Sequence, residues 1–174
     1  MNIYLDNNAT TKPLDEVAEV VAQSIASQYA NPSSQHIAGF EIRKLIEEAR
    51  LSISDMINAS SPEEIIFTSG GTESITQCFY TAIGFLDNKI SSIIISAVEH
   101  IAVLEAAKFC KTFIDSMIKI GVDNKGQLDL HKLEDVIAKN SPVFVSLMLA
   151  NNETGVIFPI NKISEICKKH GALL

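Results

Sequence analysis

The chain has 174 residues, of which 47% are hydrophobic and 20% charged, a composition that favours a folded globular protein over a disordered one. Its formal net charge of −7 argues against a general nucleic-acid-binding function. It has no apolar run long enough to span a membrane and no signal-peptide pattern at its start. Its three cysteines show no metal-ligand spacing. We therefore expect a cytoplasmic protein with reduced thiols and no metal or membrane partner.

The first half of the chain predicts mainly helices. Apolar residues recur at helical spacing in three segments, and a short run of β-branched and aromatic residues precedes the third. The expected elements are helices over 14–28 and 39–58, a strand over 64–68 and a helix over 73–84. Asn31-Pro32 separates the first two helices, because a residue before proline avoids the helical backbone conformation.

The second half alternates strands with helices. Strands are expected over 92–96, 116–120 and 142–149, and helices over 102–113, 130–139 and 160–170. Residues 171–174 resemble the start of one more strand. This alternation indicates crossover connections and a mainly parallel sheet. Because no linker or repeat interrupts the pattern, we predict a single α/β domain over residues 1–174.

A glycine turn follows the predicted strand over 64–68 and opens the next helix. Gly70 and Gly71 would let the backbone approach an anion, and a helix start offers unpaired N–H groups with partial positive charge. Thr72 could cap the helix and donate its hydroxyl to a phosphate oxygen. The alternative is a plain strand-to-helix turn with a threonine cap. The segment is neither a P-loop, since no lysine follows the glycines, nor a GxGxxG motif.

Five short motifs, in order along the chain, carry a family resemblance. They read YLDNNATT at 4–11, NPSSQH at 31–36, TSGGTES at 68–74, EHIAVL at 99–104 and ANNETGV at 150–156. Together they resemble class V aminotransferase-fold enzymes, and among these the cysteine desulfurases of the iron–sulfur cluster and nitrogen-fixation type. The resemblance implies the large domain of a dimeric fold-type-I transferase that uses pyridoxal 5'-phosphate (PLP), with residues 1–13 packed on it. It also implies conversion of L-cysteine to L-alanine, with sulfane sulfur passed to an acceptor or scaffold protein.

The same resemblance implies roles for individual residues. Gly71 and Thr72 match the cofactor phosphate contacts, made through a backbone N–H and a hydroxyl. His100 matches a catalytic histidine that stacks on the pyridine ring and serves as an acid–base group; the alternative is a helix-capping or core histidine. Asn152 matches an asparagine that contacts the ring hydroxyl and the substrate carboxylate, the alternative being a turn residue. Asn7 matches a position at the substrate entrance.

Two positions depart from the family pattern. Thr76 stands where the family usually has asparagine, and Phe158 where glutamine is common before proline. Neither position is one that carries the cofactor directly, so the departures bear on substrate and activity level more than on fold.

The family pattern continues beyond the position of Leu174. It goes on to a carboxylate that pairs with the pyridine nitrogen, a lysine that holds the cofactor covalently and a cysteine that carries the sulfur. None of the twelve lysines stands in that context, and Cys78, Cys110 and Cys167 are expected to be core or surface thiols. We therefore expect a truncated domain that does not turn over cysteine by itself.

Two other interpretations of this pattern remain open. The chain is either one half of a split PLP enzyme completed by a second chain, or a non-catalytic remnant or interaction module. In each case we expect the apolar strands over 93–95 and 143–149 to lack part of their cover, and the chain to self-associate as a result.

Overall fold

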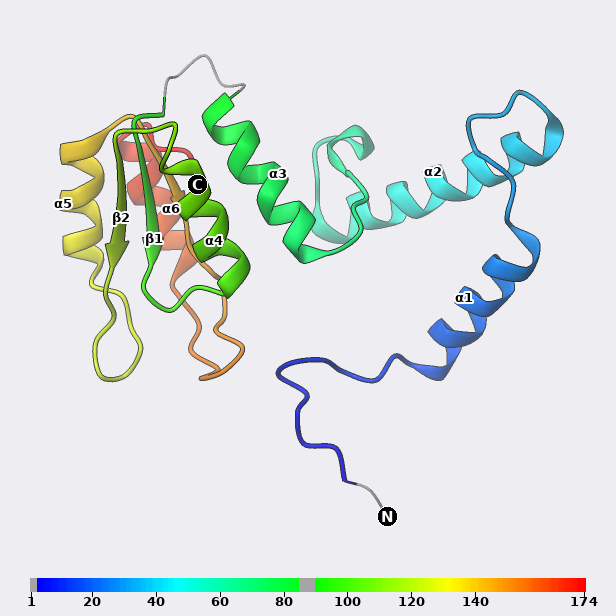
Figure 1. The fold of residues 1–174 in the computed structure, drawn as a ribbon, viewed down its shortest axis with the longest axis horizontal. Coiled ribbons are helices and arrows are strands. Elements are labelled where there is room, and N and C mark those ends of the chain that lie inside the picture. Colours follow the sequence, from blue (N-terminus) through cyan, green and yellow to red (C-terminus); the bar gives the residue numbers. More distant parts are fainter. Residues whose placement is uncertain (1–2, 85–89) are drawn as a thin grey trace. The chain divides into compact units, whose positions relative to one another are not determined.

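The structure, a computed structural model, describes residues 3–84 and 90–174. The chain forms two compact units, Met1–Phe67 and Thr68–Leu174 (Figure 1), and each is described by itself. The packing of residues 1–13 on the rest of a single domain therefore stays a prediction. No helix in the described ranges combines the length and the apolar content needed to cross a membrane.

The first unit contains the helices α1 (Asp15–Ser27) and α2 (Ile37–Ile57), followed by the 3-10 turn η1 (Pro62–Glu64). Both helices were predicted from their apolar spacing. The imidazole Nδ1 of His36 accepts a hydrogen bond from Gly39 N at 3.3 Å and caps α2. The two helices bury few residues: α1 has none, and α2 has only Gly39 and Ser54.

The predicted strand over 64–68 is wrong. This segment comprises the end of η1 and residues without regular secondary structure, and it pairs with no strand among the described residues. Arg50 holds it instead, because its guanidinium donates to the Ile65 carbonyl and lies 5.1 Å from the centroid of the Phe67 ring. A sequence with β-propensity becomes a strand only where a neighbouring strand completes its ladder.

The second unit is built on a parallel sheet in the order β2-β1-β3. Its strands are β1 (Ser92–Ser96), β2 (Ser116–Ile120) and β3 (Val143–Ser146), and its helices are α3 (Gly71–Gly84), α4 (Ile101–Cys110), α5 (Leu130–Asn140) and α6 (Ile160–Lys169). Ile94 of β1 lies opposite Ile118 of β2 and Val145 of β3. The prediction of a parallel α/β sheet is therefore confirmed.

The outer edge of β3 is paired by the segment predicted to begin another strand. Leu173 N donates to Val143 O at 3.0 Å, and Val145 N donates to Leu173 O at 2.8 Å. Leu173 forms a parallel bridge with Phe144. β3 itself is shorter than the predicted 142–149, because the chain leaves the sheet after Ser146 and enters the loop that leads to α6.

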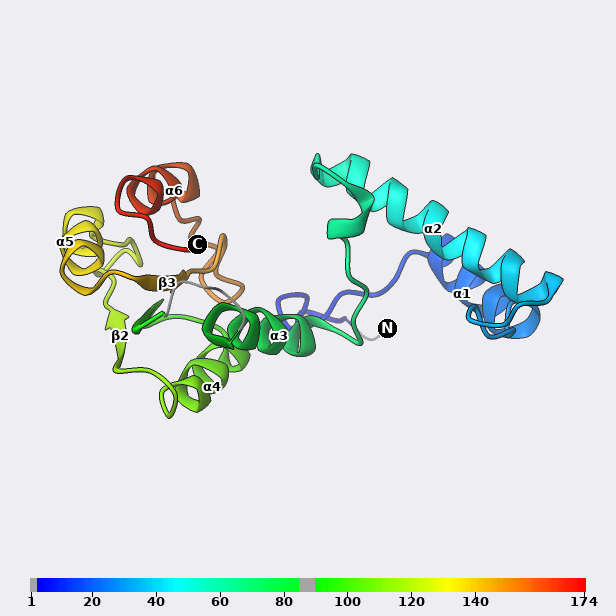
Figure 2. The ribbon, with the colours of Figure 1, turned by 90° about the horizontal axis from the view of Figure 1, so that it is seen from above.

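Helices cover both faces of the sheet. Figure 2 shows α3 and α4 on one side and α5 and α6 on the other. Ile93 and Ile95 pack into a core cluster with residues of α3 and α4, whereas Ile94 packs into a second cluster with residues of α5 and α6.

The expectation that these strands present apolar surface to solvent is wrong for 93–95 and 143–145, where no residue is more than 7% exposed. Their cover comes from helices already within the unit, as is usual for a parallel sheet. Of the residues expected to be uncovered, Leu149 lies beyond the end of β3 and is 63% exposed.

Candidate functional site

Three predicted site segments lie where the strands of the second unit end. α3 begins at Gly71, α4 begins directly after His100, and the loop containing Asn152 follows β3. Figure 1 shows the first turns of α3 and α4 and the loop after β3 on the side of the arrowheads. In open parallel sheets, ligands bind outside the carboxyl ends of the strands, which is where these segments lie. The fold thus brings Gly71, Thr72, His100 and Asn152 to one end of the same unit.

The glycine turn before α3 is held by its own side chains. Glu73 Oε2 accepts from Ser69 N at 2.6 Å, and hydrogen bonds from the Ser69 side chain and backbone hold the pKa of Glu73 below its ordinary value. The hydroxyls of Thr68 and Ser74 lie 2.7 Å apart, and each is within hydrogen-bond distance of Gly70 O, at 3.1 and 3.2 Å. These contacts fix the loop without using the N–H groups that open the helix.

The donors at the start of α3 suit a phosphate group. Apart from the adjoining backbone and chain neighbours, no atom of the described residues lies within 4 Å of the position that a side chain on Gly70 or Gly71 would occupy, so an anion can reach the backbone. Thr72 is exposed, and within the described part of the chain its hydroxyl makes no hydrogen bond. Backbone N–H groups at a helix start, joined by one free hydroxyl, are the donor set that binds phosphate oxygens in many proteins.

His100 is exposed and stands at the N-cap of α4. Its Nδ1 accepts from Ala102 N at 3.1 Å, so the cap requires Nδ1 to be unprotonated and leaves the ring proton on Nε2. The alternative interpretation of His100 as a helix cap is therefore confirmed. Capping and cofactor contact use different parts of the ring, so the predicted stacking and acid–base role stays a prediction.

The loop after β3 gives its two asparagines different environments. Asn151 is buried, and its Oδ1 accepts from Glu153 N at 3.0 Å and Thr154 N at 2.8 Å, which closes a turn over 152–154. Asn152 stands in this turn, as its alternative interpretation expected. Asn152 is exposed beside it. Asn7 belongs to the other unit, where its carbonyl accepts from the Thr11 hydroxyl at 3.3 Å. The substrate contacts of Asn152 and Asn7 stay predictions.

Two polar residues beside the predicted site are buried and were not predicted to matter. Glu99 and Asn151, each 8% exposed, directly precede His100 and Asn152. The sequence carries one signal that points to them: each stands within a recognised motif, immediately before a residue with a predicted role.

Comparison with known proteins decides the family. The model of the class V aminotransferase family matches residues 3–174. The chain belongs to the aminotransferase class-V family. It is 41% identical over 172 residues to a cysteine desulfurase of Sinorhizobium fredii, an alignment that covers 98% of this chain and 44% of that protein.

Solved structures give the same result for the class V fold. A NifS-like protein matches with a TM-score of 0.90 and 36% identity, over 98% of this chain and 46% of that one. SspA, solved in complex with cysteine, matches with a TM-score of 0.86 and 27% identity, over 97% of this chain and 48% of that one. The predicted family and α/β fold class are confirmed, and the chain spans less than half the length of these relatives.

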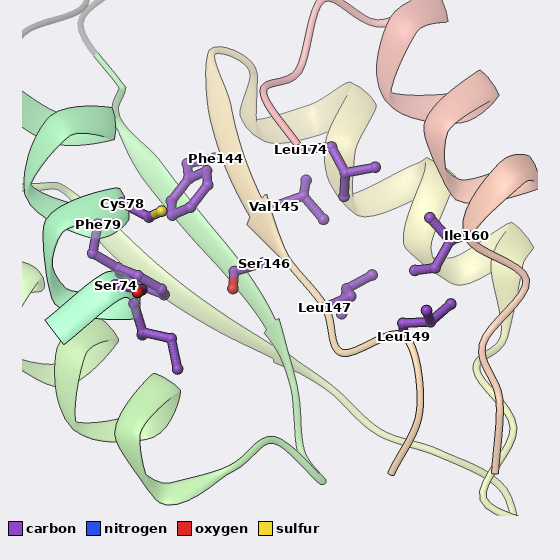
Figure 3. A pocket seen from close by; sticks show the side chains of 11 residues that line it. Ser74, Cys78, Phe79, Phe144, Val145, Ser146, Leu147, Leu149, Ile160 and Leu174 are labelled. Carbon is purple, nitrogen blue, oxygen red and sulfur yellow. The ribbon is translucent and has the colours of Figure 1, made fainter. Parts of the chain in front are cut away.

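An apolar pocket of about 440 Å³ opens in the second unit and includes none of the predicted site residues (Figure 3). It is lined by Ser74, Ile75, Cys78 and Phe79 of α3, by 144–147 and Leu149 of β3 and the loop after it, by Ile160 of α6 and by Leu174. None of Gly71, Thr72, His100 and Asn152 lines it. Its apolar walls do not suit a phosphate group or an amino-acid carboxylate.

The three thiols of this class V chain lie on helices, as predicted. Cys78 is exposed, whereas Cys110 and Cys167 are buried, and burial raises the pKa of both buried thiols. Among the residues described in the structure, no group of three or more His, Cys, Asp or Glu side chains is arranged to hold a metal ion.

Proposed function

We propose that this chain provides the phosphate- and ring-contacting part of the PLP site of a cysteine desulfurase. The observation that carries the proposal is the gathering of Gly71, Thr72, His100 and Asn152 at the strand ends of one unit. It is supported by the family of the chain and by the cysteine desulfurases among its relatives.

The residues of the chain have distinct parts in this proposal. The Gly71 N–H and the Thr72 hydroxyl bind the phosphate. The His100 ring would contact the pyridine ring and would move a proton through Nε2, since Nδ1 is engaged with Ala102 N. The Asn152 amide orients the ring hydroxyl and the substrate carboxylate. When bound, PLP supplies an electron sink for breaking bonds at the substrate α-carbon.

The substrate proposed for the whole protein is L-cysteine, and the proposed partner is a protein that accepts the sulfur. Support comes from the relatives named cysteine desulfurase and from SspA, which was solved with cysteine. We further propose that the protein works in the cytoplasm as a dimer. Its three cysteines are free thiols, which suits a reducing compartment.

Calorimetric titration with PLP tests the phosphate contact. The chain should bind PLP reversibly and bind pyridoxal, which lacks the phosphate, more weakly. We expect dialysis to remove the PLP and borohydride to fix none of it, because no lysine of the chain stands in the family's cofactor context. Equal affinity for PLP and pyridoxal would remove the glycine turn from the proposal, and a borohydride-stable adduct would show that one of these lysines holds the cofactor.

An assay of alanine and sulfide tests whether the 174-residue chain converts L-cysteine by itself. With PLP, L-cysteine and a thiol reductant, the 174-residue chain should form neither product above a protein-free control. A relative of full length, such as the Sinorhizobium fredii enzyme, is the positive control. Turnover by the chain alone would mean that its own thiols and amines suffice for the chemistry.

A further inference from the structure

The buried polar residues of the chain concentrate at one place. In the ranges 3–84 and 90–174 the buried polar and charged residues are Ser54, Ser92, Ser96, Glu99 and Asn151. Three of these, Ser96, Glu99 and Asn151, lie at the end of the sheet that carries the candidate site. A buried polar group costs free energy unless it is hydrogen-bonded, and every buried side-chain polar atom in the described ranges has a partner.

Glu99 and Asn151 join the two loops that follow β1 and β3. Glu99 Oε1 accepts from Met148 N at 2.9 Å and from the Ser96 hydroxyl at 2.7 Å. In the opposite direction, Asn151 Nδ2 donates to Val98 O at 3.0 Å. Each loop therefore contributes one side chain that binds the backbone of the other. We call the Glu99–Met148 and Asn151–Val98 hydrogen bonds the cross-loop clamp.

The clamp acts one residue away from each predicted cofactor contact. His100 and Asn152 are exposed, whereas Glu99 and Asn151, which directly precede them in the chain, are buried. Because the side chains of Glu99 and Asn151 are tied to Met148 N and Val98 O, the clamp restricts where the next residue of each loop can lie. A second set of bonds, from Asn151 Oδ1 to Glu153 N and Thr154 N, also fixes the turn in which Asn152 stands.

We propose that Glu99 and Asn151 are positioning residues whose cross-loop clamp sets the separation and orientation of His100 and Asn152. The value of that arrangement for cofactor binding rests on the proposed function, whereas the clamp itself rests on the geometry of the two loops. Preorganised contacts hold a ligand more tightly than contacts that must be ordered on binding.

Three substitutions separate the clamp from general loss of stability. Asn151→Asp keeps the oxygen that accepts from Glu153 and Thr154, but it replaces the donor to Val98 O with a second oxygen. Glu99→Leu removes the acceptor for Met148 N at similar side-chain volume. Glu99→Gln retains such an acceptor and is the matched control.

The four histidines of the chain give a local readout. In a protein with carbon-13-labelled histidine rings, we expect the His100 ring signal to move in Asn151→Asp and in Glu99→Leu, and to keep its position in Glu99→Gln. The signals of His131 and His170, in the same unit, should stay in place in all three. In the wild type, the Met148 amide hydrogen should exchange at least about tenfold more slowly than an unstructured amide.

The proposal is overturned if the His100 signal stays in place in both disruptive variants while their unfolding temperature falls. It is also overturned if the wild-type Met148 amide exchanges at the unstructured rate, a test that needs no variant to fold. PLP titration of the same proteins should show about tenfold weaker binding in Asn151→Asp, the scale of one lost hydrogen bond. Failure of the wild type to bind PLP would count against the proposed function, and the histidine and exchange data would still decide the clamp.

Discussion

Thr72 supplies the side-chain hydroxyl of the predicted phosphate contact, and this hydroxyl is exposed at the start of α3. Thr72→Ala should weaken PLP binding by about 1–2 kcal/mol, the scale of one hydrogen bond to a charged group. Thr72→Ser should keep most of the affinity. Thr76→Ala is the matched control, because the Thr76 hydroxyl donates to Thr72 O at 2.8 Å within the helix. Calorimetric titration measures the affinity of each variant for PLP. Equal affinity in the wild type and Thr72→Ala would refute the contact between the Thr72 hydroxyl and the phosphate.

The thiols should differ sharply in reactivity, since the thiolate is the reactive form. Cys78 is exposed, and burial raises the pKa of Cys110 and Cys167. A disulfide reagent such as Ellman's should therefore modify one thiol rapidly in the native chain and all three after denaturation. Cys78→Ser should remove the rapid phase. Two rapid thiols in the native protein would contradict the burial of the other two.

Sequence motifs located the exposed residues of the candidate site but not the buried ones behind them. Gly71, His100 and Asn152 belong to short local patterns, and the fold places all three at the strand ends. The partners of Glu99 and Asn151 lie 49 and 53 residues away along the chain. Such pairs depend on how two loops meet in space, which the local pattern of one sequence does not contain.

At the scale of elements, every predicted helix formed, and β1 and β2 match the predicted 92–96 and 116–120 residue for residue, but the predicted strand over 64–68 did not form. The apolar repeat that predicts a helix lies within the helix itself, and α1, α2 and α5 match their predicted ranges within two residues at each end. A strand also needs a neighbour. The segment over 64–68 has the composition of a strand but no strand partner in the described residues, whereas 171–174, with a weaker pattern, pairs with β3.

The pairing of α5 with α6 gives a pH-dependent prediction. Glu134 Oε1 lies 2.7 Å from Lys169 Nζ and 3.1 Å from His170 Nε2, and hydrogen bonds from Lys169 first and His170 second hold the pKa of Glu134 below its ordinary value of 4.5. A carboxyl with a lowered folded-state pKa stabilises the fold above the unfolded value. That contribution is lost as the pH falls below about 4.5 through the folded-state pKa.

Urea unfolding at pH 6 and at pH 3.5 measures this contribution. Glu134→Gln should destabilise the protein at pH 6 and should lose less stability than the wild type between the two pH values. Glu165→Gln removes the same charge from an exposed position on α6 and should leave the wild-type pH dependence intact. A pH dependence of Glu134→Gln that matches that of the wild type would show that the Lys169 and His170 contacts contribute nothing to folding.

At the scale of the whole molecule, the sequence predicted exposed apolar surface on the strands of the sheet, but the structure has it on α1 of the first unit. The strands of the second unit are covered by their own helices. In the first unit, α1 has no buried residue, and Val17, Val21 and Ile25 are 50%, 52% and 75% exposed. These three residues recur every fourth position and form one stripe along the helix. A helix of 13 residues with no buried face has little to stabilise it in water unless the stripe is covered.

The chain should therefore self-associate through the first unit rather than through its sheet. We expect light scattering at micromolar concentration to report species larger than a monomer, and a hydrophobic dye to bind. The triple variant Val17→Gln, Val21→Gln and Ile25→Gln should reduce both signals, because it removes the stripe that association would bury. The pair Glu19→Gln and Gln23→Glu, on the opposite face of α1, keeps the net charge and the stripe and should behave as the wild type. A monodisperse, dye-silent wild-type monomer would show that the stripe is covered within one chain, and a triple variant that associates as strongly as the wild type would place the contact elsewhere.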